Sequence, residues 1–417
     1  MNTRRHPPSP AAGAAPGALR VAICQTVLPQ YRVPVYNLLG AQPGVELTVF
    51  ADARMGSLES GTGRTHFAHE LAPVRHFRLL GQELRTQAAL FRAVDPRRFD
   101  LAILPWDARY ANLLPAVLKA RLGGPPVVLW GHGYSRWPSP LRDSLRNFCG
   151  HRADAVLLYT QTIAERLVRQ NGFDPQRVFV AQNALDQEPI RAAREHWLAR
   201  PKELAAFAAE RGLDPQRTLI FVSRLEAENR IGLLLQATAR ICAREPRARL
   251  VIVGDGPERQ ALEARAADLG LGGRVVFAGK MYDDMALAPW MLSASLLCYP
   301  VNIGLSLLHA MGYGLPVVTG DDIAAQNPEI EALTHGVNGL LYRNGDIDHL
   351  AEQCLNILTD AALRQRLRQG ALHTVAEEYT LERMVQGFLD LGRLADGHDR
   401  LVRSLAQPHN EPAETQP

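Results

Sequence analysis

Two arginines follow a short apolar run in the second half of the chain and could bind phosphate. The run is Thr218–Val222, and Arg224 and Arg230 come after it, the second at the start of an amphipathic stretch. A guanidinium beside a helix N-terminus matches phosphate in charge and in fork geometry. From the spacing alone, a phosphate site and two solvated surface charges both remain open.

A second candidate anion site follows the apolar run Ser295–Tyr299. Gly304 permits a tight turn there, and a helix that begins near Ser306 would leave its first N–H groups free for an anion. His309 lies about one turn further along that helix. It either faces a ligand or packs against its neighbours.

Glycines follow two other predicted strands of this half. Gly254 and Gly256 come after Arg249–Val253, and the pair Gly279-Lys280 comes after Arg274–Ala278. Glycine allows the backbone to approach a ligand closely. The dinucleotide pattern G-x-G-x-x-G lacks its third glycine here, so each loop by itself fits any turn from strand to helix.

Carboxylates follow the predicted strand Pro316–Thr319 and open a later helix. Glu329 and Glu331 lie in an Asn-Pro-Glu-Ile-Glu segment, where they could bind hydroxyls or a metal. The D-x-D sequence Asp346-Ile347-Asp348 stands at the start of a predicted helix. Helix N-capping is the interpretation favoured for it over a metal site.

The first half of the chain offers two polar loops after predicted strands. His132 stands between two glycines after Pro126–Trp130, and histidine is the side chain most easily charged near neutral pH. Gln25, Tyr31 and Arg32 lie in the loop region that follows the run beginning at Leu19. Patterns typical of hydrolases, P-loop NTPases and zinc proteases are missing from the sequence.

Short apolar runs alternate with helical patterns, which predicts parallel sheets covered by helices on both faces. We therefore expect an α/β protein of two doubly wound, Rossmann-like domains that face each other across a cleft. The predicted strands are Leu19–Gln25, Val45–Phe50, Phe99–Leu104, Pro126–Trp130, Ala155–Tyr159, Val178–Ala181, Thr218–Val222, Arg249–Val253, Arg274–Ala278, Ser295–Tyr299, Pro316–Thr319 and Gly339–Tyr342. Ligands of such sheets bind beyond the carboxyl ends of the strands, where the loops described above lie.

The series of strands runs twice, which sets the expected boundaries. We predict a first domain over 19–190, a second over 191–378 and a C-terminal helix over 379–399 that returns to the first domain. Residues 1–18 and 400–417 are interpreted as disordered tails.

Charge and cysteine content limit the classes of function. The net charge is +3, from 46 Lys+Arg and 43 Asp+Glu, which argues against a nucleic-acid binder. Residues 1–190 hold 22 basic and 14 acidic side chains (+8), and the remainder holds 46 − 22 = 24 and 43 − 14 = 29 (−5). Basic side chains of the first half could meet an anionic membrane surface, and an Arg-rich solvated surface is the alternative. That set is Arg64, Arg75, Arg78, Arg85, Arg97 and Arg98.

The cysteines and the N-terminus favour a cytoplasmic protein, with peripheral association at the inner face of the membrane as an option. The five cysteines are scattered and form no C-x-x-C, which favours reduced, buried thiols. The sequence has no apolar run of membrane-spanning length and no signal-peptide core.

The order of these loops resembles the GT-B glycosyltransferases, and within them glycosyltransferase family 4. The resemblance covers about 19–395. Its specific stretches are Phe221–Leu225, Leu250–Glu258, Val276–Gly279, Gly304–Thr319 and Gly336–Leu341, with Pro29–Pro34 and Trp130–Gly133 resembling a bacterial subgroup that acts on cell-surface glycans.

The resemblance implies a role for each matching residue. Arg224 matches the arginine that neutralises the donor diphosphate, and we expect Arg230 to supply the second charge beside Asn229, which holds the usual lysine position. His132 resembles the histidine that faces the donor sugar. The remaining matches concern the nucleotide: Gly304, Leu305 and Ser306 would receive the phosphates, while Gly254, Gly256, Gly279 and Lys280 would lie at the base.

One departure from the family concerns its two glutamates, whose positions hold Val301 and His309 here. His309 can still bond a ribose hydroxyl, whereas the side chain of Val301 cannot bond a sugar. We expect the N–H groups of Ile303 and Gly304, or the carboxylates of Glu329 and Glu331, to take over that contact.

The resemblance implies a retaining transferase that moves a sugar from a UDP- or GDP-linked donor to a glycan or lipid-linked acceptor. It implies no cofactor and no required metal, because arginines neutralise the diphosphate. Gln25, Tyr31 and Arg32 would then face the acceptor. The alternatives are a nucleotide-sugar epimerase or phosphorylase of the same fold and a non-catalytic nucleotide-sugar-binding partner.

Overall fold

The computed structural model describes residues 17–53, 65–79, 81–134 and 139–395. The described residues up to Ala181 and from Val385 onward form one compact unit, and Gln182–Met384 form the other. This division falls nine residues before the boundary at 190/191 expected from the sequence, because helix α6 (Glu188–Leu198) packs against α10 (Asp284–Leu292) of the second unit. The predicted tails lie almost wholly outside the described residues.

The first unit is built on a parallel sheet in the order β3-β2-β1-β6-β7-β8-β9. Its strands are β1 (Leu19–Val27), β2 (Val45–Asp52), β3 (Ala68–Leu71), β6 (Leu101–Pro105), β7 (Val127–Gly131), β8 (Ala155–Leu158) and β9 (Val178–Val180). The helices of this unit are α1 (Val33–Gly40), α2 (Ala89–Ala93), α3 (Leu113–Ala120), α4 (Pro140–Arg152) and α5 (Gln161–Asn171). The central strands are apolar and buried almost throughout, as expected of strands with helices on both faces.

An antiparallel pair, β4 (Val74–Leu79) and β5 (Gln82–Gln87), accompanies this sheet. Strands β3, β4 and β5 are not among those predicted from the sequence. Their side chains are mostly exposed and polar, so they carry neither the continuous apolar run nor a clear alternation.

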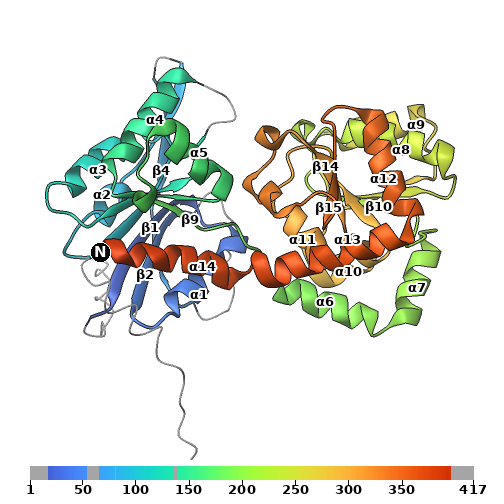
Figure 1. Cartoon of the computed structure of the whole chain (residues 1–417), viewed down its shortest axis with the longest axis horizontal. Coiled ribbons are helices and arrows are strands. Elements are labelled where there is room, and N and C mark those ends of the chain that lie inside the picture. The colour runs from blue at the N-terminus through green and yellow to red at the C-terminus, as the bar shows by residue number, and fades with distance from the viewer. Residues whose placement is uncertain (1–16, 54–64, 80, 135–138, 396–417) are drawn as a thin grey trace, which may run out of the picture. The chain divides into compact units, whose positions relative to one another are not determined.

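The second unit has a parallel sheet in the order β12-β11-β10-β13-β14-β15. Its strands are β10 (Thr218–Val222), β11 (Arg249–Val253), β12 (Val275–Gly279), β13 (Leu296–Cys298), β14 (Val317–Gly320) and β15 (Gly339–Tyr342). In Figure 1, α8 (Ile231–Arg244), α9 (Arg259–Asp268) and α12 (Ile347–Thr359) lie on one side of it, and α10, α11 (Ser306–Gly312) and α13 (Ala361–His373) on the other. Every strand predicted from an apolar run is therefore present.

The C-terminal segment joins the first unit from Val385 onward. It comprises the second part of α14 (Leu381–Leu389) and a short 3₁₀ turn (Asp390–Leu394). The ring of Phe388 lies 4.9 Å from that of Trp130, in an edge-to-face arrangement. A Cβ on Gly387 would approach the carbonyl oxygen of Val180 to 2.4 Å, so the helix packs closely on the end of β9.

Candidate functional site

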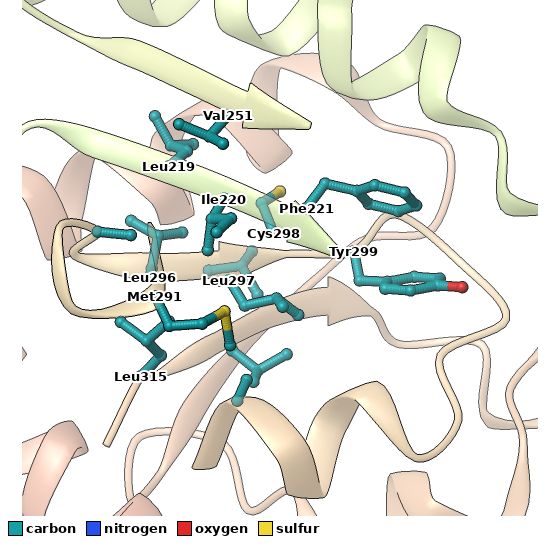
Figure 2. Close-up of a cluster of buried hydrophobic side chains, with 14 of the residues drawn as sticks. Leu219, Ile220, Phe221, Val251, Met291, Leu296, Leu297, Cys298, Tyr299 and Leu315 are labelled. Atoms are coloured by element: carbon teal, nitrogen blue, oxygen red, sulfur yellow. The ribbon is translucent and has the colours of Figure 1, made fainter. Parts of the chain in front are cut away.

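The second unit reverses its strand order between β10 and β13, and the loops after these two strands meet there. Sheets of this kind bind ligands beyond such a switch point. Figure 2 shows Phe221 and Tyr299 side by side at the ends of the two strands, and their ring centroids lie 4.8 Å apart. The Tyr299 hydroxyl donates to Oγ of Ser223 at 3.0 Å, and burial raises the pKa of this tyrosine. The two loops are thus fixed to each other at their base.

Arg224 and Arg230 both lie at this edge. The Arg224 side chain is 83% exposed, and its ion pair with Glu226 at 3.3 Å is a weak surface contact. Arg230 immediately precedes α8 and has a φ of 47°, a left-handed conformation that is costly for a residue other than glycine. Buried Asn229 donates to the carbonyl oxygen of Arg224 at 2.8 Å and holds the loop between them. Both guanidinium groups are accessible, as a phosphate site requires.

The turn between β13 and α11 has the shape expected from the sequence. Helix α11 begins at Ser306, whose hydroxyl donates to the carbonyl oxygen of Val222 at 3.0 Å and so ties this helix to β10. Asn302 has a φ of 69°, and Asn327 donates to its carbonyl oxygen at 2.9 Å. A Cβ on Gly304 would lie 3.2 Å from the same Asn327 amide nitrogen, so a larger residue there would crowd the Asn327 side chain.

One predicted donor at this turn is already used. The N–H of Ile303 donates to Oε1 of Gln326 at 2.8 Å, and both residues are fully buried. The expectation that this N–H contacts a donor sugar is therefore wrong. Gln326 also donates to Thr319 and to the carbonyl oxygen of Gly320, so its amide group is held on three sides. Sequence reasoning missed Gln326 because nothing in the spacing indicates that its side chain turns inward.

His309 has a partner that the sequence did not predict. Its Nε2 lies 2.7 Å from Oδ1 of Asp284 at the start of α10, and the Tyr313 hydroxyl donates to the same oxygen at 3.2 Å. Burial by itself would raise the pKa of Asp284. The hydrogen bond and charge of His309, together with the Tyr313 hydroxyl, outweigh it and lower this pKa. Asp284 could have been suspected only from its place after β12, at the edge of the sheet that carries His309.

The glycines of the β11 loop are explained by protein contacts. A Cβ on Gly254 would lie 1.9 Å from the carbonyl oxygen of Ser223, and one on Gly256 would lie 2.5 Å from that of Leu225. Gly279 accepts from the Gly254 N–H at 2.8 Å and has a φ of 77°. These residues let the three loops pack together, and Lys280 next to them is exposed. Whether they also approach a base stays a prediction.

The predicted carboxylates differ in their surroundings. Glu329 is buried in a 3₁₀ turn (Pro328–Ala332) and accepts from the Asn183 amide at 2.6 Å. Glu331, in the same turn, is half-buried. A contact of either with a sugar stays a prediction. Asp346 accepts from the His349 N–H at 2.9 Å and caps α12, which confirms the N-capping interpretation of D-x-D.

In the first unit, Tyr31, Arg32 and His132 meet around Tyr159. Arg32 is 4% exposed, and its guanidinium carbon lies 4.8 Å from the ring centroid of Trp130 and 5.3 Å from those of Tyr31 and Tyr159. The His132 ring lies 5.0 Å from that of Tyr159. Enclosed by rings, Arg32 organises this cluster, whereas Tyr31 and His132 are exposed to solvent. Sequence reasoning missed Tyr159, although its place directly after β8 was the available signal.

A second polar group lies where β1 and β6 adjoin. The Thr26 hydroxyl is 2.7 Å from that of Tyr110, and Arg85 on β5 donates to Asp107 at 2.6 Å. Gln25 itself is half-buried, and its carbonyl oxygen accepts from Gln87 at 2.9 Å. These contacts fasten the β4–β5 pair to the sheet edge. These contacts could not be predicted from the sequence, because Arg85 and Asp107 lie far apart along it.

No cluster of His, Cys, Asp and Glu that could hold a metal ion occurs among the described residues. Over the same part of the chain, none of the helices combines the length and apolar character needed to cross a bilayer.

Comparison with known proteins finds the same architecture elsewhere. The chain is similar to Anabaena HepE in complex with UDP, with a TM-score of 0.66 at 19% identity over 89% of this chain and 98% of that one. It is also similar to a sucrose-phosphate synthase from Thermosynechococcus elongatus, with a TM-score of 0.63 at 18% identity over 90% and 98% of the two chains. The fold is therefore the GT-B fold, with its two parallel-sheet units.

Two protein families match, one on each unit. Residues 39–188 match Glycosyltransferase Family 4, and residues 216–360 match Glycosyl transferases group 1. Over these two stretches the chain thus resembles the glycosyltransferases of these families.

Characterised relatives share part of this sequence. N-acetyl-alpha-D-glucosaminyl L-malate synthase of Bacillus anthracis is 30% identical over 45% of this chain and 48% of its own length. The alpha-D-kanosaminyltransferase of Streptomyces kanamyceticus is 25% identical over 63% and 69%, and the D-inositol 3-phosphate glycosyltransferase of Kribbella flavida is 31% identical over 53% and 52%. The chain thus spans about half the length of the first and third of these relatives.

Proposed function

We propose that the protein is a retaining glycosyltransferase that takes a sugar from a UDP- or GDP-linked donor. The acceptor would be a glycan or a lipid-linked glycan in the synthesis of cell-surface polysaccharide or glycolipid. The observation that carries the proposal is the position of Arg224, Arg230 and the start of α11 around one switch point of the second sheet.

The leaving group explains why these groups suit the reaction. Breaking the bond between sugar and phosphate places negative charge on a nucleoside diphosphate. Arg224 and Arg230 would neutralise that charge, and the N–H groups at Gly304–Ser306 would add the positive end of a helix dipole. Because arginines supply the charge, the proposal includes no metal and no cofactor.

The nucleoside would lie beside the diphosphate, along α11 and the loop after β12. His309 would bond a ribose hydroxyl, and Asp284 would hold its ring in place from α10. Position 301 holds the buried Val301, so it supplies no carboxylate to the sugar. The sugar contact would then come from the Gly304 N–H or from Glu331.

His132 and Tyr31 of the first unit would face the sugar and the acceptor. Tyr159 and Arg32 would fix their positions from behind. The transfer itself would be a same-face displacement in which the enzyme aligns the reactants and stabilises the leaving group.

The first test replaces Arg224 with Ala, and separately with Lys. We expect Arg224→Ala to lower kcat/KM by about 100-fold or more, because a charge that stabilises the leaving group is lost. Arg224→Lys should keep part of the activity. The matched control is Arg247→Ala, which removes an exposed arginine before the amino end of β11, at the opposite edge of the sheet. Full activity of Arg224→Ala would contradict the phosphate assignment.

A panel of UDP- and GDP-sugars with polyprenyl-linked and free glycan acceptors would identify the substrates. Release of nucleotide only in the presence of an acceptor supports a transferase, and the anomeric configuration of the product, read by NMR, tests retention. An inverted product would overturn the retaining mechanism alone.

A second candidate function is a non-catalytic nucleotide-sugar-binding partner. The observation that favours it is Val301, whose side chain offers no polar atom to the sugar. Thermal stabilisation by nucleotide sugars without turnover on any acceptor would support this candidate. Interconversion of two donor sugars without transfer would instead indicate an epimerase.

A further inference from the structure

Helix α4 of the first unit exposes its apolar side chains. Leu141 is 81% exposed, Leu145 40% and Phe148 43%. These positions are spaced four and three residues apart, so they form one stripe along the helix. A surface helix normally turns such a stripe toward the core.

The opposite face of α4 is polar and is partly buried. Arg142, Arg146 and Asn147 each have a buried side-chain atom without a hydrogen-bond partner within the described residues, and Arg146 pairs with Asp143 at 2.7 Å. Helix α4 thus turns its polar side chains toward the core of its own unit and its apolar side chains toward solvent. An exposed apolar stripe of this kind indicates a surface that binds a partner outside the unit.

The neighbouring helix α3 extends the exposed apolar surface. Leu118 is exposed, and Leu122, just beyond the end of α3, is 89% exposed. Arg121 donates to the carbonyl oxygen of Arg152 at 2.9 Å, so the C-terminal ends of α3 and α4 are joined. We call the exposed side chains of Leu118, Leu122, Leu141, Leu145 and Phe148 the apolar stripe.

The segment that carries this stripe is strongly basic. Residues 113–152 hold six Lys and Arg and one acidic residue, Asp143, for a net charge of +5, and of these cations Lys119, Arg121 and Arg152 are exposed. The Arg152 guanidinium lies over the Phe148 ring at 4.7 Å from its centroid, which places a cation beside an exposed apolar group. Apolar side chains flanked by arginines suit a bilayer interface, where the former enter the acyl boundary and the latter meet anionic headgroups.

We propose that the apolar stripe on α3 and α4 docks the protein on an anionic lipid bilayer. A second copy of the chain is a poorer occupant, because a symmetric contact would set the exposed cations Lys119, Arg121 and Arg152 of the two copies against each other. A bilayer is where a lipid-linked acceptor would be found, so the biological meaning of this docking rests on the proposed function. Vesicle binding needs neither donor nor acceptor, so the two can fail separately.

The β4–β5 pair is the competing surface of the same unit. Phe77 and Leu79 on β4, and Leu71 at the end of β3 just before it, are exposed as well. Several arginines in and beside it are paired with carboxylates: Arg78 on β4 pairs with Glu83, and nearby Arg92 and Arg98 pair with Glu70 on β3. Among the arginines that the sequence analysis assigned to a membrane surface, Arg85 is mostly buried against Asp107, and Arg64 lies outside the described residues. This surface therefore provides a matched control.

The test is flotation of the purified full chain with vesicles of phosphatidylcholine and phosphatidylglycerol at low salt. We expect the wild type to float with these vesicles and not with pure phosphatidylcholine. The variant Leu141→Ser/Leu145→Ser/Phe148→Ser should bind about tenfold or more weakly, because three inserted side chains are lost. The control Leu71→Ser/Phe77→Ser/Leu79→Ser should bind as the wild type does. Circular dichroism of both variants checks the fold.

Three outcomes would overturn the proposal. The first is failure of the wild type to bind anionic vesicles at low salt. The second is loss of binding in the β4–β5 variant while the α4 variant still binds. The third is a dimer in light scattering that only the α4 variant abolishes, with no vesicle binding, which would make a second copy the occupant.

Discussion

Nε2 of His309 lies 2.7 Å from Oδ1 of Asp284, although the two residues belong to different helices of the second unit. The pair joins the start of α10 to the first turns of α11, beside the switch point of the sheet. A carboxylate therefore stands behind this histidine, in a chain whose own sequence places none at positions 301 and 309. Asp284 thereby fixes the orientation of the His309 ring, which in the proposed function bonds the ribose.

The first prediction concerns acid stability. The pKa of Asp284 is lowered in the folded protein, so its contribution to stability is present above the unfolded value of about 3.9 and is lost as the pH falls through the folded one. Asp284→Asn should cost about 1–2 kcal/mol near neutral pH and progressively less as the pH falls below about 3.9. Melting temperatures of both proteins across this range would check the sign. A difference that stays constant with pH would show that the charge plays no part.

The second prediction concerns nucleotide binding. His309→Ala should raise KM for the donor several-fold, by about 1 kcal/mol for one hydrogen bond, and should change kcat less. Asp284→Asn should have a smaller effect in the same direction, because the ring remains and only its orientation is freed. Calorimetric titration with UDP and GDP separates these effects from catalysis. An unchanged affinity in His309→Ala would remove this residue from the nucleotide site.

The third prediction concerns the strained backbone at Arg230. Arg230→Gly should raise the free energy of unfolding by about 1 kcal/mol, since glycine adopts the left-handed conformation without cost. The same variant should lose transferase activity together with the guanidinium. Arg230→Ala should lose activity without gaining stability, which separates the two effects. A fully active Arg230→Gly would show that the strain serves no phosphate contact.

The fourth prediction concerns loop packing. Gly254→Ala should destabilise the second unit by about 3 kcal/mol or more, because its Cβ would meet the carbonyl oxygen of Ser223 at 1.9 Å. The control is Gly272→Ala, where a Cβ has no neighbouring atom within 4 Å. Urea unfolding followed by tryptophan fluorescence would compare them. Equal stability of the two variants would contradict this explanation of Gly254.

The fold could be predicted well from the sequence because its central strands are recognisable as apolar runs. Runs such as Thr218–Val222 and Arg249–Val253 are buried on both faces, and burial forces an apolar composition that can be seen directly. Strands β3, β4 and β5 carry exposed side chains. Exposure does not require an apolar composition, so these strands cannot be recognised in the sequence in this way.

The candidate site could be predicted in its position but not in its internal contacts. Arg224, Gly304 and Ser306 were found because parallel sheets place strand ends at one edge. The bonds of Ile303 with Gln326 and of His309 with Asp284 were missed, since each joins residues more than twenty positions apart. Such pairings depend on side-chain directions, which spacing does not encode.

The Asn302–Gly304 turn is held by amide groups that carry no charge. Asn327 bonds the Asn302 carbonyl, and Gln326 bonds the Ile303 N–H. Neither amide titrates, and neither bond is screened by ions, whereas the attraction of Arg224 and Arg230 for a diphosphate weakens as salt is added. Salt should therefore leave the shape of the turn unchanged, whereas it should weaken the attraction of the two arginines for a diphosphate. Ionic strength should shift the affinity for nucleotide while the Ile303 amide stays equally slow in hydrogen exchange.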